Sequence, residues 1–250
     1  MTIIKALEKL NDDFHGLNKD FHSVHPTFQG SRSTLNVTFK LARNDPNGNP
    51  TTGIIYYPAK NGYATNAFNN DIQREAWDNY KYCNVYIQLD LYANGVLTNS
   101  GVAWYPDAGM SNAKLARIVY NGRYLYGNTD DEFSSVLTHE FGHWLNLVHT
   151  FEGGCSTSSD SQCDQTGDRV CDTPQTVGSQ GCTAVNNCLN KLVNSENYMD
   201  YSGAYGCYKM FTAGQVARME ASMHHPARVA LWQLQNLIAT GVAENKTAKM

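Results

Sequence analysis

Four side chains within eleven positions can together hold a metal ion and use it. His139, Glu140 and His143 form a His-Glu-x-x-His motif, and His149 follows six residues later. Two histidines four positions apart lie on one face of a helix, so their ring nitrogens can converge on a single ion. Glu140 is offset beside them, where a carboxylate can act on a metal-bound water without ligating the metal. The pattern predicts a catalytic zinc site.

The third histidine can join this site only if the helix ends before it. Continued helix would place His149 roughly 15 Å along the axis from His139 and off the shared face. Asn146 is the expected end, because asparagine tolerates the left-handed conformation that terminates helices. Three histidine ligands leave the fourth zinc position to water, as catalytic sites do. The alternative interpretation is that these histidines are unrelated surface residues.

A helix is expected to carry the motif. Asp130 and Asp131 can cap its start, and Phe133, Val136 and Leu137 supply an apolar stripe at helical spacing. The ligands would therefore be held on a supported element.

Before the zinc motif, segments with apolar residues at helical spacing alternate with segments that have the two-residue repeat of a strand. Apolar residues at helical spacing predict helices near residues 4–18 and 69–80. Alternating or β-rich runs predict strands at residues 35–39, 54–57, 84–91, 101–105 and 118–120. Strands interleaved with helices predict an α/β sheet, with the zinc helix packed behind it.

The second half of the chain has a different character. Residues 150–195 show little periodicity and are rich in Gly, Ser, Asp and Cys, so their order must come from disulfides or ions. Thr212 and Gln215 form a capping-box signature for a later helix. We predict one catalytic domain with two subdomains, residues 1–149 with the sheet and zinc helix and residues 150–250 with the final helices.

Cysteine usage indicates an oxidising compartment. Six of the seven cysteines crowd residues 155–207, and none of their spacings is the two-residue gap of a zinc knuckle. A disulfide framework is therefore favoured over a second zinc site, although six cysteines allow 15 pairings. Cys83 stands apart and is expected to be a buried thiol.

Composition narrows the classes of partner. The chain has 250 residues, 42% of them hydrophobic, which suits one enzyme domain. A formal net charge of −4 with no run of Lys or Arg argues against nucleic acid and anionic membrane as partners. No apolar stretch approaches the roughly 20 residues that span a bilayer, and no signal-peptide core is present. We expect a mature, secreted chain processed from a precursor, of unknown oligomeric state.

The zinc motif also carries a resemblance to a known family. His139 to His149, followed by Tyr198-Met199-Asp200-Tyr201, resembles the metzincin metallopeptidases with their Met-turn, although Asn146 stands where these enzymes usually have glycine. Within that group the chain looks like the pappalysin family. The segments that carry this likeness are His143-Trp144-Leu145, His149-Thr150-Phe151, Gly153-Gly154-Cys155 and Asn197 to Ser202, with weaker echoes at residues 10–14, 45–54 and 211–216.

The resemblance implies a fold and several roles. It implies the zincin-like metzincin fold: a twisted mixed sheet with backing and active-site helices, then an irregular C-terminal subdomain with disulfides and the Met-turn. Met199 would form a floor beneath the imidazoles, and the Tyr201 hydroxyl would lie near zinc and donate to the oxyanion. A packed surface tyrosine is the alternative for Tyr201. The implied disulfides are Cys155–Cys188 and Cys182–Cys207, which leaves Cys163–Cys171.

The resemblance also suggests a calcium site. Asp168, Asp172 and Thr173 supply hard oxygen donors in a stretch that resembles the calcium-binding segment of pappalysin relatives. The alternative is a solvated turn in which the two aspartates cap backbone amides.

The function expected from these residues is a secreted zinc-dependent endopeptidase. A zinc-bound water activated by Glu140 would attack the peptide bond, and the cofactors would be zinc and, less directly, calcium. The alternatives are a non-catalytic zinc-binding scaffold, which the intact Glu140 disfavours, and a zinc hydrolase of a non-peptide amide.

Substrate binding is expected to use extended backbone. By resemblance, Gly101, Val102, Ala103 and Trp104 would form an exposed edge strand that pairs with a peptide. Relatives that cut before Lys or Arg carry acidic residues shortly after the Met-turn, where this chain has Gly203 and Ala204. A basic side chain in that primed-side pocket would lack a countercharge, so we expect only weak preference for Lys or Arg there.

Overall fold

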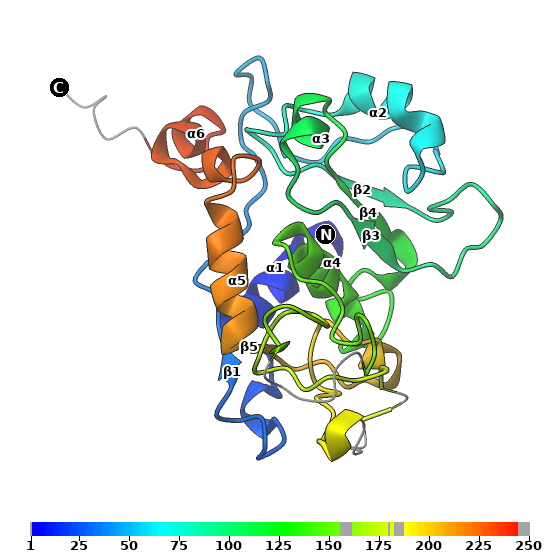
Figure 1. Ribbon diagram of the computed structural model, residues 1–250. Helices are drawn as coiled ribbons and strands as arrows, with labels where there is room; N and C mark the ends of the chain where they lie inside the picture. Colours follow the sequence, from blue (N-terminus) through cyan, green and yellow to red (C-terminus); the bar gives the residue numbers. More distant parts are fainter. Residues whose placement is uncertain (1, 156–161, 180, 183–187, 245–250) are drawn as a thin grey trace. The chain divides into compact units, whose positions relative to one another are not determined.

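Figure 1 shows the computed structural model, which describes residues 2–155, 162–179, 181–182 and 188–244. The chain divides into two compact units, each built from two separate segments: residues 1–38 with 123–221, and residues 39–122 with 222–250. The two units are defined by the contacts that residues make within each of them. The predicted division at residue 149 concerns the two sides of the zinc site and stays a prediction.

The first unit contains the zinc motif on a helix supported by the N-terminal helix. α1 (Thr2–His15) lies against α4 (Val136–Trp144) and buries Leu10 and Phe14. Two polar contacts fix the pair: Lys9 Nζ donates to Ser135 Oγ at 2.8 Å, and Thr138 Oγ1 donates to the buried Asp13 Oδ2 at 2.7 Å. Thr138 directly precedes His139, so this buried bond also fixes the rotation of α4 about its axis.

A third helix of this unit starts at the predicted capping box. β1 (Arg32–Ser33) pairs antiparallel with β5 (Phe211–Thr212), and α5 (Ala213–Met223) follows at once. Gln215 N donates to Thr212 Oγ1 at 3.2 Å, and Thr212 N donates to Gln215 Oε1 at 2.9 Å. The reciprocal bonds confirm the capping box and satisfy two amides that a helix start leaves unpaired.

The second unit contains a mixed three-stranded sheet. Its order is β2 (Val85–Gln88), β4 (Ile118–Asn121), β3 (Gly101–Ala103); β2 runs parallel to β4, and β3 runs antiparallel. The helices are α2 (Asn69–Glu75), α3 (Ala108–Asn112) and α6 (Leu234–Ala239). The predicted α/β class with a mixed sheet is confirmed. In this unit the buried Arg117 guanidinium stacks on the Trp104 ring at 3.6 Å.

Two predicted strands are wrong. Residues 35–39 and 54–57 form no ladder; the nearest strand is β1, which ends at Ser33. Leu35 N instead donates to Phe14 O at 2.9 Å, which ties this segment to the end of α1. Tyr56 is 86% exposed, and no described strand pairs with its segment. A run of β-branched and aromatic residues forms a strand only where a partner edge exists.

The other elements occur where they were predicted; most are shorter, and β4 extends one residue beyond its predicted range of 118–120. The helix expected at residues 69–80 ends at Glu75, because Ala76 is already extended, and the strand expected at residues 84–91 covers only Val85–Gln88. Among the described helices, none has the length and apolar character needed to cross a bilayer.

Three disulfides cross-link the irregular segment of the first unit. They are Cys155–Cys188, Cys163–Cys171 and Cys182–Cys207, the same pairs that the resemblance implied. The first and third overlap in sequence, so they interlock two loops. Cys83 is a free, partly buried thiol, and burial raises its pKa to about 12. A thiol with this pKa is an inert packing group at neutral pH.

Candidate metal centre

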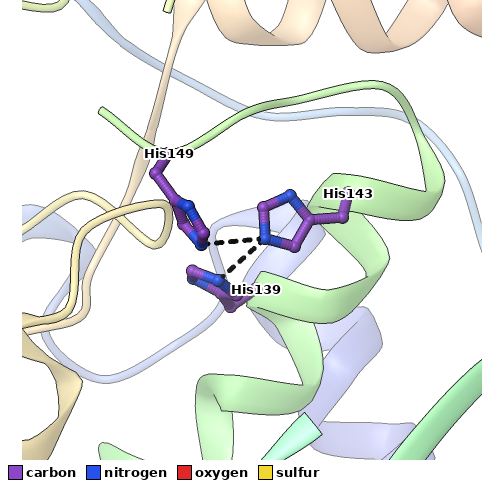
Figure 2. Close-up of side chains that lie close together, drawn as sticks. All are labelled: His139, His143 and His149. Atoms are coloured by element: carbon purple, nitrogen blue, oxygen red, sulfur yellow. Dashed lines mark hydrogen bonds between the residues drawn. The ribbon is translucent and has the colours of Figure 1, made fainter. Parts of the chain in front are cut away.

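Three imidazoles converge at the end of α4 (Figure 2). His143 Nε2 lies 3.1 Å from His139 Nε2 and 3.1 Å from His149 Nε2. In a tetrahedral zinc site with Zn–N bonds of about 2.0–2.1 Å, neighbouring ligand nitrogens lie about 3.3 Å apart. These two separations are close to that value, and the ligand atoms of all three histidines that the sequence singled out lie within 4.8 Å of one another.

The third imidazole reaches the others because α4 ends at Trp144 and the chain reverses at Asn146, two residues later. Asn146 has a φ of +76°, and Leu147 N donates back to Gly142 O at 2.9 Å. This left-handed residue reverses the chain, so His149 returns toward the face that presents His139 and His143. The predicted reversal of the chain is therefore present, at the predicted residue.

Hydrogen bonds at Nδ1 determine the protonation of two imidazoles. His139 Nδ1 lies 2.6 Å from Tyr198 O, and His143 Nδ1 lies 2.7 Å from Leu147 O. A carbonyl oxygen can only accept, so each Nδ1 carries the proton and each Nε2 presents a lone pair. Burial lowers the pKa of His139 and His143, and it lowers the pKa of His149 to about 3. All three rings are therefore neutral near pH 7.

Such an arrangement fits a bound cation. One dashed contact of Figure 2 joins His139 Nε2 and His143 Nε2, which both present lone pairs, and that repels unless a positive ion lies between them. Three neutral imidazoles are a ligand set that zinc prefers. Glu140 and Met199 are two further predicted residues of this site.

Glu140 is a buried carboxylate with an unsatisfied oxygen. Its side chain is almost fully buried, and Oε2 has no hydrogen-bond partner among the described residues. Burial raises the Glu140 pKa to about 8. Native proteins rarely leave such an atom unpaired without a functional reason, and a group that accepts and releases protons near neutral pH suits acid–base catalysis.

Met199 packs directly on the zinc helix. The residue is fully buried, and a Cβ built on Gly142 would overlap the Met199 sulfur. Only glycine at this point of α4 lets the thioether approach the helix between His139 and His143. Sequence analysis missed Gly142, although a glycine inside an otherwise regular helix was a usable signal.

Asp200 ties the loop after His149 to the turn that contains Met199. It is fully buried, and its carboxylate accepts hydrogen bonds from Thr150 Oγ1, from the N and Oγ of Ser179, and from Tyr201 N, at 2.7 to 3.1 Å. Thr150 N also donates to Met199 O at 3.2 Å. The Asp200 carboxylate is fully engaged, so its structural role is to join the two loops.

Tyr201 lies beside the imidazoles and is open to solvent. Its ring centroid is 4.8 Å from that of His149 and 5.9 Å from that of His139, and the side chain is 59% exposed. The phenol is therefore near two of the three ligands without being buried in a core. Its role in stabilising the oxyanion stays a prediction.

Gly203 is buried beneath an aromatic ring. A Cβ at this position would overlap the Tyr208 ring, and the Tyr208 hydroxyl donates to Asp200 O. The packing of Tyr208 thus excludes any side chain at residue 203, an acidic one included. The side chain of Ala204 lies outside what the structure describes, so the primed-side pocket stays a prediction.

The residues predicted to bind calcium all take part in hydrogen bonds within the protein. Asp168 Oδ2 accepts from Thr173 Oγ1 at 2.5 Å, which brings two of the three together. Asp172 instead accepts from Thr212 Oγ1 at 2.6 Å and from Gly214 N at 2.8 Å, at the start of α5. Asp168 Oδ1 also accepts from Val170 N at 3.0 Å, so both aspartates cap backbone amides, as the alternative interpretation has it. Calcium binding by Asp168, Asp172 and Thr173 stays a prediction.

The expected substrate strand is at a sheet edge. β3 contributes Gly101, Val102 and Ala103 and pairs only with β4 among the described strands, with Trp104 directly after it. Pairing of peptide backbone with this edge stays a prediction.

Comparison with known proteins defines the class. The family model described as pregnancy-associated plasma protein-A matches residues 66–224. An extracellular metalloprotease of Verticillium alfalfae is 36% identical over 152 residues, 57% of this chain and 49% of its own length. One of Sordaria macrospora is 38% identical over 151 residues, 56% of this chain and 47% of its own. The chain thus spans about half the length of these relatives.

Solved structures agree with this class. Mature mirolysin of Tannerella forsythia in complex with a cleaved peptide superposes with a TM-score of 0.76 at 25% identity, covering 98% of this chain and 91% of that one. A promirolysin mutant gives 0.75 at 27% identity, covering 98% and 80%. The fold and the histidine cluster are those of a metzincin metallopeptidase. The chain belongs to the pappalysin family.

Proposed function

We propose that this protein is a secreted zinc-dependent endopeptidase. The observation that carries the proposal is the convergence of three neutral imidazoles beside the buried, unsatisfied Glu140 carboxylate. Extracellular metalloproteases among the relatives, and a peptide complex of mirolysin, support peptide bonds as the substrate class. Partners would be protein or peptide chains.

Each residue of the site has a separate task. Zinc held by the Nε2 atoms of His139, His143 and His149 would lower the pKa of a water to about 7 and polarise the scissile carbonyl. Glu140 takes a proton at Oε2 during attack and returns it to the departing amine. Tyr201 donates its hydroxyl proton in a hydrogen bond to the carbonyl oxygen as charge develops there. The carbonyls of Tyr198 and Leu147 hold two ligand rings in the required tautomer.

Specificity and localisation are further parts of the proposal. Substrate binds extended along β3, and the absence of an acid at Gly203 leaves basic side chains only weakly preferred after the cut. Three disulfides and the extracellular relatives support secretion, and the promirolysin neighbour supports processing from a precursor. Calcium at Asp168 and Thr173 is a second, structural cofactor.

The test is cleavage by wild type and by Glu140→Ala of a denatured protein and a peptide library. We expect the wild type to cut and the variant to lose activity by about a thousandfold or more while still binding zinc. Equal cleavage by both would contradict the role of Glu140. Zinc binding without cleavage by either would favour the scaffold, and hydrolysis of small amides alone would favour a non-peptide substrate.

A further inference from the structure

We propose that Phe151 is a positioning residue that sets the orientation of the His149 imidazole and the Tyr201 phenol. The proposal rests on the proposed zinc site and adds a residue to it. The Phe151 ring is stacked on His149, with centroids 4.6 Å apart and planes 9° from parallel. It also meets the Tyr201 ring edge-on, at 4.7 Å and 65°.

The three ligands differ in how their rings are held. His139 and His143 each place Nδ1 within hydrogen-bond distance of a backbone carbonyl, as metal-bound histidines usually do. For His149, the structure describes no such acceptor at Nδ1; the one recorded polar contact of its ring is between Nε2 and His143 Nε2. Another contact must therefore keep this ring turned toward its neighbours, and the stacked Phe151 ring is placed to do so.

The backbone around Phe151 is fixed on both sides, which makes the ring a firm surface. Glu152 N donates to His149 O at 3.0 Å, and Gly154 N donates to Phe151 O at 3.0 Å. These two turns fold the Phe151 ring back over the residue two positions earlier. Thr150 is in turn held by Asp200 Oδ2 at 3.1 Å.

A glycine approaches the same ring from another loop. A Cβ built on Gly178 would lie 3.6 Å from Phe151 Cδ1, and Gly178 has a φ of +96°. The Phe151 ring is therefore in contact with His149 and Tyr201, and a side chain at residue 178 would touch it as well. A planar ring is required for parallel stacking, whereas a branched aliphatic side chain would fill the volume without presenting a flat face.

Tyr201 depends on the same contact. Its side chain is 59% exposed, and its ring packs against neighbouring aromatic rings. Phe151 and His149 both lie against its ring, at 4.7 and 4.8 Å. One aromatic side chain thus orients the third metal ligand and the proposed oxyanion donor together.

The experiment compares Phe151→Leu, Phe151→Met and Phe151→Tyr with wild type. Zinc affinity is measured by competition with a chromogenic chelator, kcat and KM are measured with a fluorogenic peptide, and melting is measured on zinc-free protein. We expect the Leu and Met variants to bind zinc about tenfold more weakly and to lose kcat by at least that factor, with KM within about twofold of wild type. Phe151→Tyr keeps the ring and should restore both values to within about threefold.

The matched control is Phe68→Leu, at another half-buried aromatic whose ring lies 6.3 Å from that of Tyr63, in the second unit. It should leave zinc affinity unchanged. Zinc affinity near wild type in Phe151→Leu and Phe151→Met would overturn the proposal, as would a Phe151→Tyr variant as impaired as they are. Because zinc affinity is read without substrate, a wild type that binds zinc but cuts nothing would refute the proposed function and leave this inference standing.

Discussion

At the scale of single residues, two backbone carbonyls determine the charge state of the site. Tyr198 O and Leu147 O accept from Nδ1 of His139 and His143, which leaves the inner nitrogens unprotonated. Desolvation acts in the same direction, since it lowers the pKa of all three imidazoles. The site is thus ready to receive a cation without first releasing protons near pH 7.

Tyr201→Phe tests the residue placed to stabilise the oxyanion. Removing one hydroxyl donor should lower kcat by about 100-fold, because that bond forms as charge develops, and should change KM by less than about twofold. Steady-state kinetics with a fluorogenic peptide measures both constants.

The control for that measurement is Tyr56→Phe, at a tyrosine that is 86% exposed. It should leave both constants unchanged. A Tyr201→Phe variant in which kcat and KM change by equal factors would remove the oxyanion role and leave a packed surface tyrosine.

At the scale of elements, one left-handed residue connects the helix to the third ligand. Asn146 has a φ of +76°, and its backbone carbonyl accepts a hydrogen bond from Arg218 Nε at 2.7 Å. That bond does not involve the side chain of residue 146. Asn146→Gly should therefore be neutral or slightly stabilising. Asn146→Ala should lower the free energy of unfolding by about 1 kcal/mol, because a Cβ in this conformation is strained.

Chemical denaturation of the two variants measures the difference. Zinc affinity should fall in Asn146→Ala alone, since strain at the helix end displaces His149. Equal stability of the two variants would show that the turn does not depend on the conformation of residue 146.

How far the sequence predicts the site depends on the range of the interaction. His139, Glu140, His143 and the helix end at Asn146 follow from local spacing and backbone preference, so they were predictable. Gly142 under Met199, the hydrogen bond of Thr150 to Asp200 and the contact of Phe151 with Tyr201 depend on segments 50 to 57 residues apart meeting in space. A single sequence contains no signal for contacts between segments that are so far apart along the chain. The strands expected at residues 35–39 and 54–57 failed for the same reason, because pairing needs a partner that local pattern does not reveal.

At the scale of the whole molecule, calcium would act on stability rather than on chemistry. Adding calcium at millimolar concentration to zinc-loaded, calcium-free protein should raise its melting temperature, with about 2.7 kcal/mol of added stability at a hundredfold excess over the dissociation constant. Asp168→Asn should abolish this increase. Differential scanning calorimetry measures the shift.

Asp172→Asn distinguishes a calcium ligand from a helix cap. Because Asp172 accepts from Gly214 N at the start of α5, its loss should lower the melting temperature equally with and without calcium. A melting temperature of wild type that does not respond to calcium would refute the site.

The interlocked disulfides have a consequence for where the protein can work. Cys182–Cys207 encloses the turn with Met199, Asp200 and Tyr201, and Cys155–Cys188 begins six residues after His149. Before these bonds form, the histidine helix can fold while the loops that complete the catalytic apparatus lack their cross-links. In the proposed secreted peptidase, export from a reducing cell interior would therefore coincide with assembly of the complete site.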